Sequence, residues 1–247
     1  MPRGGRAAAS AHAQCVRRSF EVKRDPLLAL MKFGAAEHMA DLRLHGHLYM
    51  QSVGFFRSLE ADAARGDQHE GLTYCRQAND TVLQVKQRGK WLKVEGIEGP
   101  MLFRDGGAEI GNIYSMFAFR GSHAEAFFDG RSKWPVDVDN LRFGDSAVVF
   151  TDGDEFMRRV RAAAEREGLE LRYDLVEYVD RATYIGPVGP FRKFSAFAHQ
   201  SEFRILTKPE CETARVLTVG SLEDIAMTCP LVELNQRLRL QEGGEPV

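Results

Sequence analysis

One segment constrains the fold more than any other, because residues 112–119, NIYSMFAF, are almost entirely apolar. A strand with one solvated face alternates apolar and polar residues, whereas a strand covered on both faces is apolar along its length. The segment therefore predicts a strand that is internal to a sheet.

Strands and helices are expected in irregular order along the rest of the chain. Turn residues and the spacing of apolar side chains mark their bounds. The expected elements are a strand or helix end at 27–33, a helix at 35–45 closed by Gly46, a strand at 47–52, a hairpin at 82–94 that turns near Gly89, a strand at 146–150, a helix at 154–167, strands at 171–179 and 214–219, one long strand or two joined by a bend at 193–207, and a short helix that begins at Ser221. Strands dominate this order, which predicts an α+β fold with mixed, mostly antiparallel sheets and a few helices.

Length and composition are those of a globular protein. The chain has 247 residues, of which 44% are hydrophobic and 28% charged, so it is long enough for a core without disulfides. We expect a single compact α+β domain at residues 21–240. Residues 1–20 contain several arginines and no acidic residue, which indicates a disordered basic leader. Residues 241–247 are expected to be a flexible tail.

Net charge and cysteine use argue against several classes of protein. A net charge of −2 gives no global basic field toward nucleic acid or membrane. No apolar run approaches the roughly 18 residues of a membrane span. The four cysteines form no Cys-x-x-Cys pair, which argues against a zinc ribbon or a disulfide framework and favours the cytoplasm.

Charged side chains gather in the stretch 47–71, HLYMQSVGFFRSLEADAARGDQHEG. Phe55 and Phe56 are expected to anchor it in a core, and polar loops next to anchored elements often carry function. The pattern RGDxxEG at residues 65–71 fits a substrate loop whose arginine meets a phosphate or carboxylate. A solvated surface loop with internal ion pairs fits the same residues.

A second polar stretch, KFSAFAHQSEFRIL at residues 193–206, lies near the other end of the chain. On a strand, Gln200, Glu202 and Arg204 share one face. This polar row fits either the wall of a cleft or the solvent face of an edge strand, and alternation alone does not separate the two. We expect this stretch to meet the 47–71 stretch in space.

The histidines offer a weak metal-binding pattern. His45 and His47, with His38 and His69 nearby, have the spacing of two ligands on one strand face. Gly46 lies between them at an expected helix end, and no third ligand has a recognisable spacing. We therefore predict no metal site. The sequence also lacks GxSxG, P-loop, HExxH and GxGxxG motifs.

These features together resemble a family of uncharacterised bacterial proteins that are often encoded near phage-defence or mobile genes. The shared pattern is an early strand-helix-strand that leads to an acidic loop, an apolar central strand, and a late Glu-Phe/Tyr-Arg strand. In this chain the pattern falls at residues 31–52, 65–71, 113–117 and 202–204, and it covers most of residues 28–225. A more remote similarity is to the toxin-type ADP-ribosyltransferases. It implies an NAD-consuming transferase or glycohydrolase that acts as a toxin or defence effector.

The similarity to ADP-ribosyltransferases implies roles for individual residues. Glu202 would be the catalytic carboxylate that stabilises an oxocarbenium-like centre at the ribose. NAD would be the substrate, and a protein or nucleic acid the acceptor. Lys32 stands where that family has Arg or His, and a clear Ser-Thr-Ser motif is missing. Arginines would hold the pyrophosphate, and aromatic residues would stack on the nicotinamide ring. The implied substrate-binding residues are Lys32, Tyr49, Ser52, Phe56, Arg57, Arg65, Asp67, Glu70, Lys193 and Arg204.

Two other functions fit the same residues. A metal-dependent nuclease would use Asp67, Glu70 and Glu202 to hold a divalent ion. A non-enzymatic module that recognises a protein or nucleotide would place Glu202, paired to Arg204, at an open, shallow site that faces solvent. No membrane partner is expected.

Overall fold

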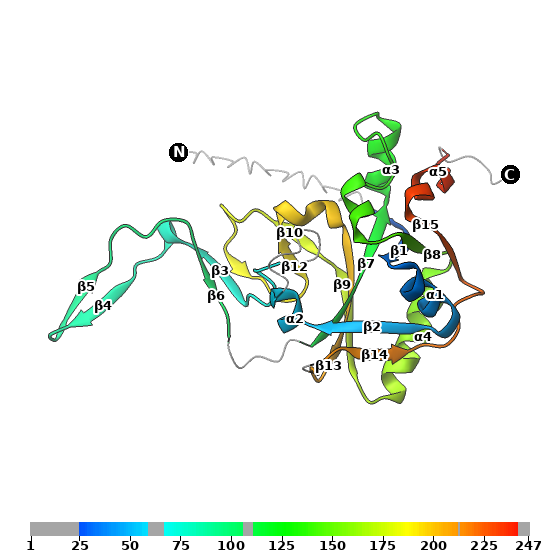
Figure 1. Ribbon diagram of the computed structural model, residues 1–247. Coiled ribbons are helices and arrows are strands. Elements are labelled where there is room, and N and C mark those ends of the chain that lie inside the picture. The colour runs from blue at the N-terminus through cyan, green and yellow to red at the C-terminus, as the bar shows by residue number, and fades with distance from the viewer. Residues whose placement is uncertain (1–24, 59–66, 106–110, 212, 242–247) are drawn as a thin grey trace, which may run out of the picture.

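The computed structural model describes residues 25–58, 67–105, 111–211 and 213–241, without the side chains of Arg57 and Ser58. It has an α+β fold with mostly antiparallel sheets, as the sequence predicts (Figure 1). The expected leader at residues 1–20, and the tail beyond Gln241, lie outside the described residues.

The largest sheet is built around β7 (Asn112–Arg120), which confirms the internal strand expected at residues 112–119. One edge of β7 pairs with β13 (Glu202–Lys208). The other edge pairs with β2 (His47–Ser52) near the start of β7 and with β1 (Leu27–Gly34) near its end. The sheet is therefore divided into two branches on that edge. Its outer strands are β8 (Ser146–Phe150) and β15 (Ala226–Pro230) beyond β1, β14 (Arg215–Thr218) beyond β2, and β9 (Glu170–Leu175) beyond β13.

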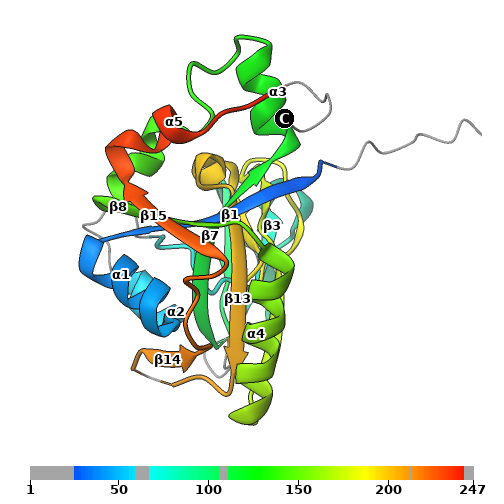
Figure 2. The ribbon, with the colours of Figure 1, turned by 90° about the vertical axis from the view of Figure 1, so that its right-hand side faces the viewer.

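The central strand is buried on both faces because its side chains alternate between two cores. Tyr114 and Met116 join the larger core, whereas Phe117 and Phe119 join a second core on the opposite face. Figure 2 shows α4 lying along β13, on the side of the larger core. The helices that contribute to the two cores are α1 (Ala36–His45) and α4 (Gly153–Arg166) for the larger one, and α3 (Gly121–Phe128) and α5 (Leu234–Arg237) for the second.

Local sequence explains the bounds of the two longer helices. α1 ends at Gly46, which has a φ of 67°. An added Cβ there would lie 1.9 Å from the carbonyl oxygen of Gly220, so both the left-handed backbone and the close approach require glycine. α4 begins after Asp152, whose carboxylate accepts the Glu155 N–H at 2.9 Å. Both helices lie where the sequence places them, within one residue at each end.

A small sheet carries an extension that leaves the body of the protein. In this sheet β3 (Tyr74–Gln77) pairs with β6 (Pro100–Phe103) and β11 (Gly186–Pro187). Between β3 and β6 the chain forms the hairpin of β4 (Gln84–Gln87) and β5 (Lys90–Lys93), which confirms the hairpin expected at 82–94. Figure 1 shows this hairpin projecting far from the large sheet. We call residues 82–94 the arm.

The prediction of a helix that begins at Ser221 is wrong. Residues 223–225 form a turn, and β15 follows directly. The Leu222 N–H donates to the Arg43 carbonyl oxygen at 2.9 Å, and β15 pairs with β8, so tertiary contacts override the local helical preference.

Residues 193–207 form two strands with a helical link, not one long strand. β12 (Arg192–Phe194) pairs in parallel with β10 (Glu177–Val179), and the 3₁₀ helix η3 (Ser195–Gln200) leads from β12 to β13. No helix in the described ranges is long and apolar enough to span a bilayer. The remaining elements are α2 (Val53–Ser58), η1 (Ala78–Asp80), η2 (Val138–Phe143) and η4 (Leu231–Glu233).

Candidate functional site

The two polar stretches do meet, through a buried ion pair. Both terminal nitrogens of Arg204 on β13 donate to the Glu70 carboxylate, at 2.8 Å and 2.7 Å. The side chains of both residues are only 3% exposed. A two-pronged pair of this kind fixes orientation as well as distance. Residues 67–71 are therefore held against one face of β13.

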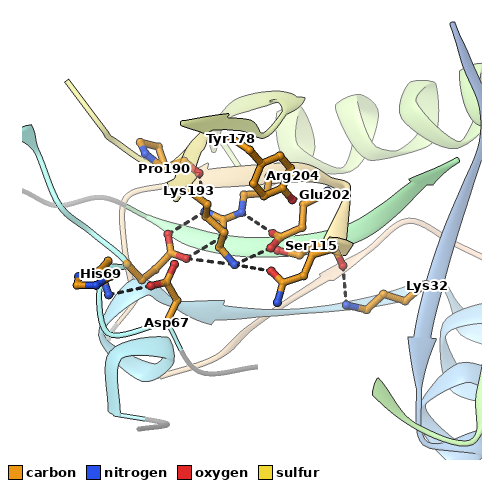
Figure 3. Close-up of polar contacts among 11 residues, drawn as sticks. Lys32, Asp67, His69, Ser115, Tyr178, Pro190, Lys193, Glu202 and Arg204 are labelled. Atoms are coloured by element: carbon orange, nitrogen blue, oxygen red, sulfur yellow. Dashed lines mark hydrogen bonds and ion pairs between the residues drawn. The ribbon is translucent and has the colours of Figure 1, made fainter. Parts of the chain in front are cut away.

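Glu202 and Lys193 extend this pair into a cluster (Figure 3). The Glu202 carboxylate accepts hydrogen bonds from Arg204 Nε at 2.7 Å and from Lys193 Nζ at 2.6 Å. Lys193 Nζ also donates to the side-chain oxygen of Gln200 at 3.0 Å and lies 3.8 Å from the Glu70 carboxylate. We call Glu70, Lys193, Glu202 and Arg204 the ion-pair cluster. Its two cations and two carboxylates balance in charge.

Glu202 and Arg204 stay charged despite burial. Burial by itself raises the pKa of Glu202, but the charges and hydrogen bonds of Arg204 and Lys193 outweigh it and hold this pKa well below its usual range. Burial likewise favours the neutral form of Arg204, yet the carboxylates of Glu202 and Glu70 raise its pKa. Each charge is thus stabilised by an opposite charge that is itself buried.

The position of β13 explains why these charges are inside the protein. Glu202 and Arg204 share one face of β13, as the alternation predicts, and both are buried. β13 lies between β7 and β9, so the alternative of an edge strand with a solvent face is wrong. Gln200, expected on the same strand face, instead ends η3 and reaches the cluster through Lys193.

Two further residues hold the cluster and were not found from the sequence. The Tyr178 hydroxyl accepts the backbone N–H of Glu202 at 2.9 Å, and the Pro190 carbonyl oxygen accepts from Arg204 at 2.6 Å. Burial, together with the charge of Glu202, raises the pKa of Tyr178. Neither residue belongs to a recognisable motif, and Pro190 acts through its backbone, so no sequence signal identifies them.

Asp67 adds a further carboxylate beside the cluster. It is 3% exposed, and its carboxylate accepts the backbone N–H of His69 at 2.8 Å. Burial and the nearby charge of Glu70 raise its pKa, against the opposing charge of Lys193. The bond to His69 closes a turn that presents Glu70 to Arg204.

The predicted residue Lys32 lies apart from the cluster, beyond Ser115 in Figure 3. Its Nζ donates to the Ser115 carbonyl oxygen at 2.6 Å and sits 4.5 Å from the centre of the Tyr114 ring. Ser115 is the β7 partner of Arg204 in the sheet register. Lys32 therefore bonds to the residue of β7 that is the sheet partner of Arg204.

The other predicted binding residues are dispersed. Tyr49 is 58% exposed on β2, opposite Val216 of β14. Phe56 is half-buried and packs with Ile113, and Ser52 Oγ accepts the Phe55 N–H at 3.2 Å. Arg65 lies outside the described residues, and so does the side chain of Arg57, whose backbone is in α2.

An open cavity of about 590 Å³ lies at the junction of β2 and α2, beside Ser52. Its described lining mixes small polar groups, one aromatic ring and one carboxylate. These lining residues are Gln51, Ser52, Gly54, Phe55, Glu210, Thr213 and Ala214. None of them belongs to the ion-pair cluster.

His45 and His47 lie side by side, but His69 does not join them. His45 and His47 have ring centres 5.6 Å apart, and His47 Nδ1 pairs with the Asp41 carboxylate at 3.0 Å. His69 instead packs edge-on against Phe194, at 5.1 Å between ring centres. Across the described ranges, no group of three or more His, Cys, Asp or Glu residues is arranged to hold a metal ion.

The arm is a second charged region, and its charged side chains are exposed to solvent. All residues from 82 to 93 are exposed, including Trp91 at 63%. Residues 82–94 contain no acidic side chain. The positive side chains are Lys86, Arg88, Lys90 and Lys93. Trp91 lies among them in the sequence, and the rest of the described chain leaves its ring exposed.

The register of the arm separates two faces. Lys86 pairs with Trp91, and Gln84 pairs with Lys93, which places these four side chains on one face. We call this the basic face. Lys86 Nζ lies 5.8 Å from the centre of the Trp91 ring. The apolar pair Val85 and Leu92 lies on the opposite face.

Comparisons with protein-family models, with curated proteins and with solved structures found no match for this chain. The function must therefore be argued from the cluster and the arm themselves.

Proposed function

We propose that this protein is a binding module for nucleic acid, with the arm as its contact surface. The observation that carries the proposal is the basic face, where Lys86 and Lys93 flank the exposed Trp91. Lysine and arginine side chains bind phosphates, and an aromatic ring stacks on bases. An exposed tryptophan among cations, without a carboxylate in the same segment, supports an anionic aromatic partner.

The distribution of charge supports the same partner. The whole chain has a net charge of −2, so setting aside the four positive charges of the arm leaves −6 for the rest of the chain. A phosphate backbone is therefore attracted to the arm, whereas the rest of the chain taken together carries a negative charge. The net charge of the chain conceals this separation.

The ion-pair cluster has a supporting part in this proposal. Both carboxylate oxygens of Glu70 and of Glu202 are bonded to buried cations of the same chain. Glu70 is followed closely by β3, the strand from which the arm departs. The pair between Glu70 and Arg204 thus ties the base of the arm to the large sheet. A fixed base limits the motion of the arm and so reduces the entropy lost when a ligand binds.

We propose a cytoplasmic location for the protein. Cys75, Cys211 and Cys229 are free thiols, which persist in a reducing compartment. Nucleic acid is accessible there.

The proposal is tested by fluorescence anisotropy with dye-labelled oligonucleotides. Replacing Lys86, Arg88 and Lys93 together with glutamine should weaken binding by at least about tenfold at low salt, because each cation releases counterions from the phosphate backbone. The matched control replaces three exposed arginines distant from the arm, Arg131, Arg142 and Arg158, with glutamine. Equal binding by the two triple variants would contradict the proposal. Strand cleavage that requires Mg²⁺ would instead support the metal-dependent nuclease.

An NAD-consuming activity is a second candidate, favoured by the gathering of several residues implied by the ADP-ribosyltransferase similarity. Asp67, Glu70, Lys193, Glu202 and Arg204 lie together in the structure. Catalysis would require the ribose to reach Glu202, which is 7% exposed.

The activity is tested by nicotinamide release from NAD, with and without cell lysate as a source of acceptor. Release by the wild type and by Glu177→Gln, but not by Glu202→Gln, would support this candidate. Glu177 is a suitable control because it is an exposed carboxylate that pairs with Arg192 on the neighbouring strand. Thermal unfolding of each variant verifies that it is folded. No release from any of the three proteins would contradict the candidate.

A further inference from the structure

We infer that the arm selects single-stranded over double-stranded nucleic acid, by stacking an unpaired base on Trp91. This inference rests on the proposed function. It adds which class of nucleic acid binds and which residue recognises it. The indole of Trp91 is among the most exposed large apolar side chains of the described chain, at 63%. Bases inside a duplex are stacked on one another, whereas bases of a single strand offer a free face to an aromatic ring.

The neighbours of Trp91 fit a strand that runs across the basic face. Lys86 is the direct cross-strand partner of Trp91, and Lys93 lies two residues along β5 on the same face. A phosphate on each side of a stacked base can reach these lysines. Gln84, opposite Lys93, adds an amide that both donates and accepts hydrogen bonds.

One internal ion pair competes with this contact. Lys93 Nζ lies 3.0 Å from the Glu95 carboxylate, and these side chains are 55% and 76% exposed. An ion pair this exposed contributes little, so a phosphate can replace the carboxylate at small cost. The remaining cations of the arm are in segments without an acidic neighbour.

The tip of the arm carries an arginine at a position whose backbone conformation favours glycine or asparagine. Arg88 has a φ of 49° and Gly89 a φ of 80°, so both central residues of the turn are left-handed. Asparagine and glycine are the residues preferred at such a position, and other L-residues are strained there. Arg88 places a guanidinium at the end of the arm despite this strain, beyond the lysines of the basic face.

Charge complementarity favours nucleic acid over a second copy of this chain as the occupant of the basic face. Two arms brought face to face would oppose Lys86 and Lys93 of one copy to the same residues of the other, and like charges repel. The opposite face carries one cation, Lys90, beside the apolar pair Val85 and Leu92. Like charge opposes pairing less there, so pairing of two copies through that face is an outcome that the experiment must separate.

The experiment measures binding of three labelled ligands by the full chain: an oligothymidylate of about a dozen nucleotides, the same length with its bases replaced by abasic linkers, and a blunt duplex. RNA and DNA strands are compared in parallel to distinguish the two sources of the same chemistry. The expected result is at least about tenfold tighter binding of the base-bearing strand than of the abasic strand or of the duplex, because only unpaired bases can stack on Trp91 and add to the phosphate contacts. Trp91→Ala should remove that difference, and Trp134→Ala should retain it. Trp134 is a matched control because it also has a lysine near its ring, Lys133 at 5.2 Å.

The inference would be overturned if the abasic strand or the duplex bound as tightly as the base-bearing strand, or if the two tryptophan variants behaved alike. If binding still fell with salt and with loss of the arm cations, the proposed function would stand without it. If none of the ligands bound, both would fail. Light scattering would then measure the molar mass of the free protein and of a Val85→Ser/Leu92→Ser variant. A dimer that the double substitution dissociates would show that the arm pairs two copies.

Discussion

The ion-pair cluster and the arm use the same types of cation in opposite environments. Arg204 and Lys193 are buried, and carboxylates of the same chain neutralise them. Lys86 and Arg88 are exposed, and no acidic residue lies in the arm beside them. A buried cation must be paired because the interior does not solvate it, whereas an exposed cation keeps its water and its attraction for other molecules. The buried cations therefore serve to hold the fold together, whereas the exposed cations of the arm remain available to bind a ligand.

This comparison separates stability from binding. Changes in the cluster are expected to alter the free energy of unfolding of the whole chain. Changes in the arm are expected to leave global unfolding almost unchanged, because the arm projects from the body (Figure 1). A variant that broke this separation would show that the two regions are coupled.

The largest effect is expected from Arg204→Met. The substitution leaves Glu70 and Glu202 buried without their shared cation, and breaking a buried pair in this way costs about 3–5 kcal/mol. Chemical denaturation measures the loss. The control replaces the whole cluster, with Glu70→Leu, Lys193→Met, Glu202→Leu and Arg204→Met. It should recover most of the lost stability, because no buried charge remains unpaired. A single variant as stable as the wild type would show that the cluster is hydrated.

A smaller effect is expected from Glu202→Gln, and it should depend on pH. Loss of the charged hydrogen bonds is expected to cost about 1–3 kcal/mol at neutral pH. Folding lowers the pKa of Glu202 below its ordinary value of 4.5, so its charge stabilises the native state above that pH. The stabilisation is lost as the pH falls from 4.5 toward the folded pKa. The difference in unfolding free energy between wild type and variant should therefore shrink in acid. A constant difference across this range would contradict the pairing.

A smaller effect on stability, confined to the arm, is expected from Arg88→Asn. Asparagine tolerates the left-handed backbone better, so the hairpin should gain up to about 1 kcal/mol of local stability. Hydrogen exchange of the Val94 amide, which donates to the Leu83 carbonyl oxygen at 2.9 Å, reports that gain. Nucleic-acid binding should weaken, with the slope of log affinity against log salt reduced by about 0.7. A parallel Arg88→Lys variant should keep the slope. Tighter binding by Arg88→Asn would show that the tip cation makes no contact.

The smallest effect is expected from Asp67→Asn, which keeps an acceptor for the His69 N–H and removes one charge. Folding raises the pKa of Asp67 above its ordinary value of 3.8, so its charge opposes folding at pH values above the folded pKa. The variant should be slightly more stable than the wild type at neutral pH. The advantage should disappear as the pH falls through the folded pKa and Asp67 binds a proton. Titration of stability against pH measures both parts, and a less stable variant at neutral pH would contradict the sign.

Local patterns predicted several elements because short-range chemistry decides them. The apolar run at residues 112–119 can bury both of its faces only inside a sheet, and it forms the internal strand β7. The hairpin near Gly89 follows from a turn that needs a positive φ. The turn at residues 223–225 was missed because contacts with Arg43 and β8, distant in sequence, outweigh the local preference.

The sequence by itself determined which polar residues stand out, and it named every member of the ion-pair cluster. The composition of residues 82–94, basic and free of carboxylates, is also fixed by the sequence, although only the exposed hairpin drew attention to it. Only the tertiary structure decided that the alternating row with Glu202 and Arg204 is buried, because the cover comes from Glu70, 134 residues away from Arg204. Alternation records that a strand has two different faces, and it carries no information about what lies against each one. The same limit applies to the arm, whose charges matter because nothing in the described chain folds back over them.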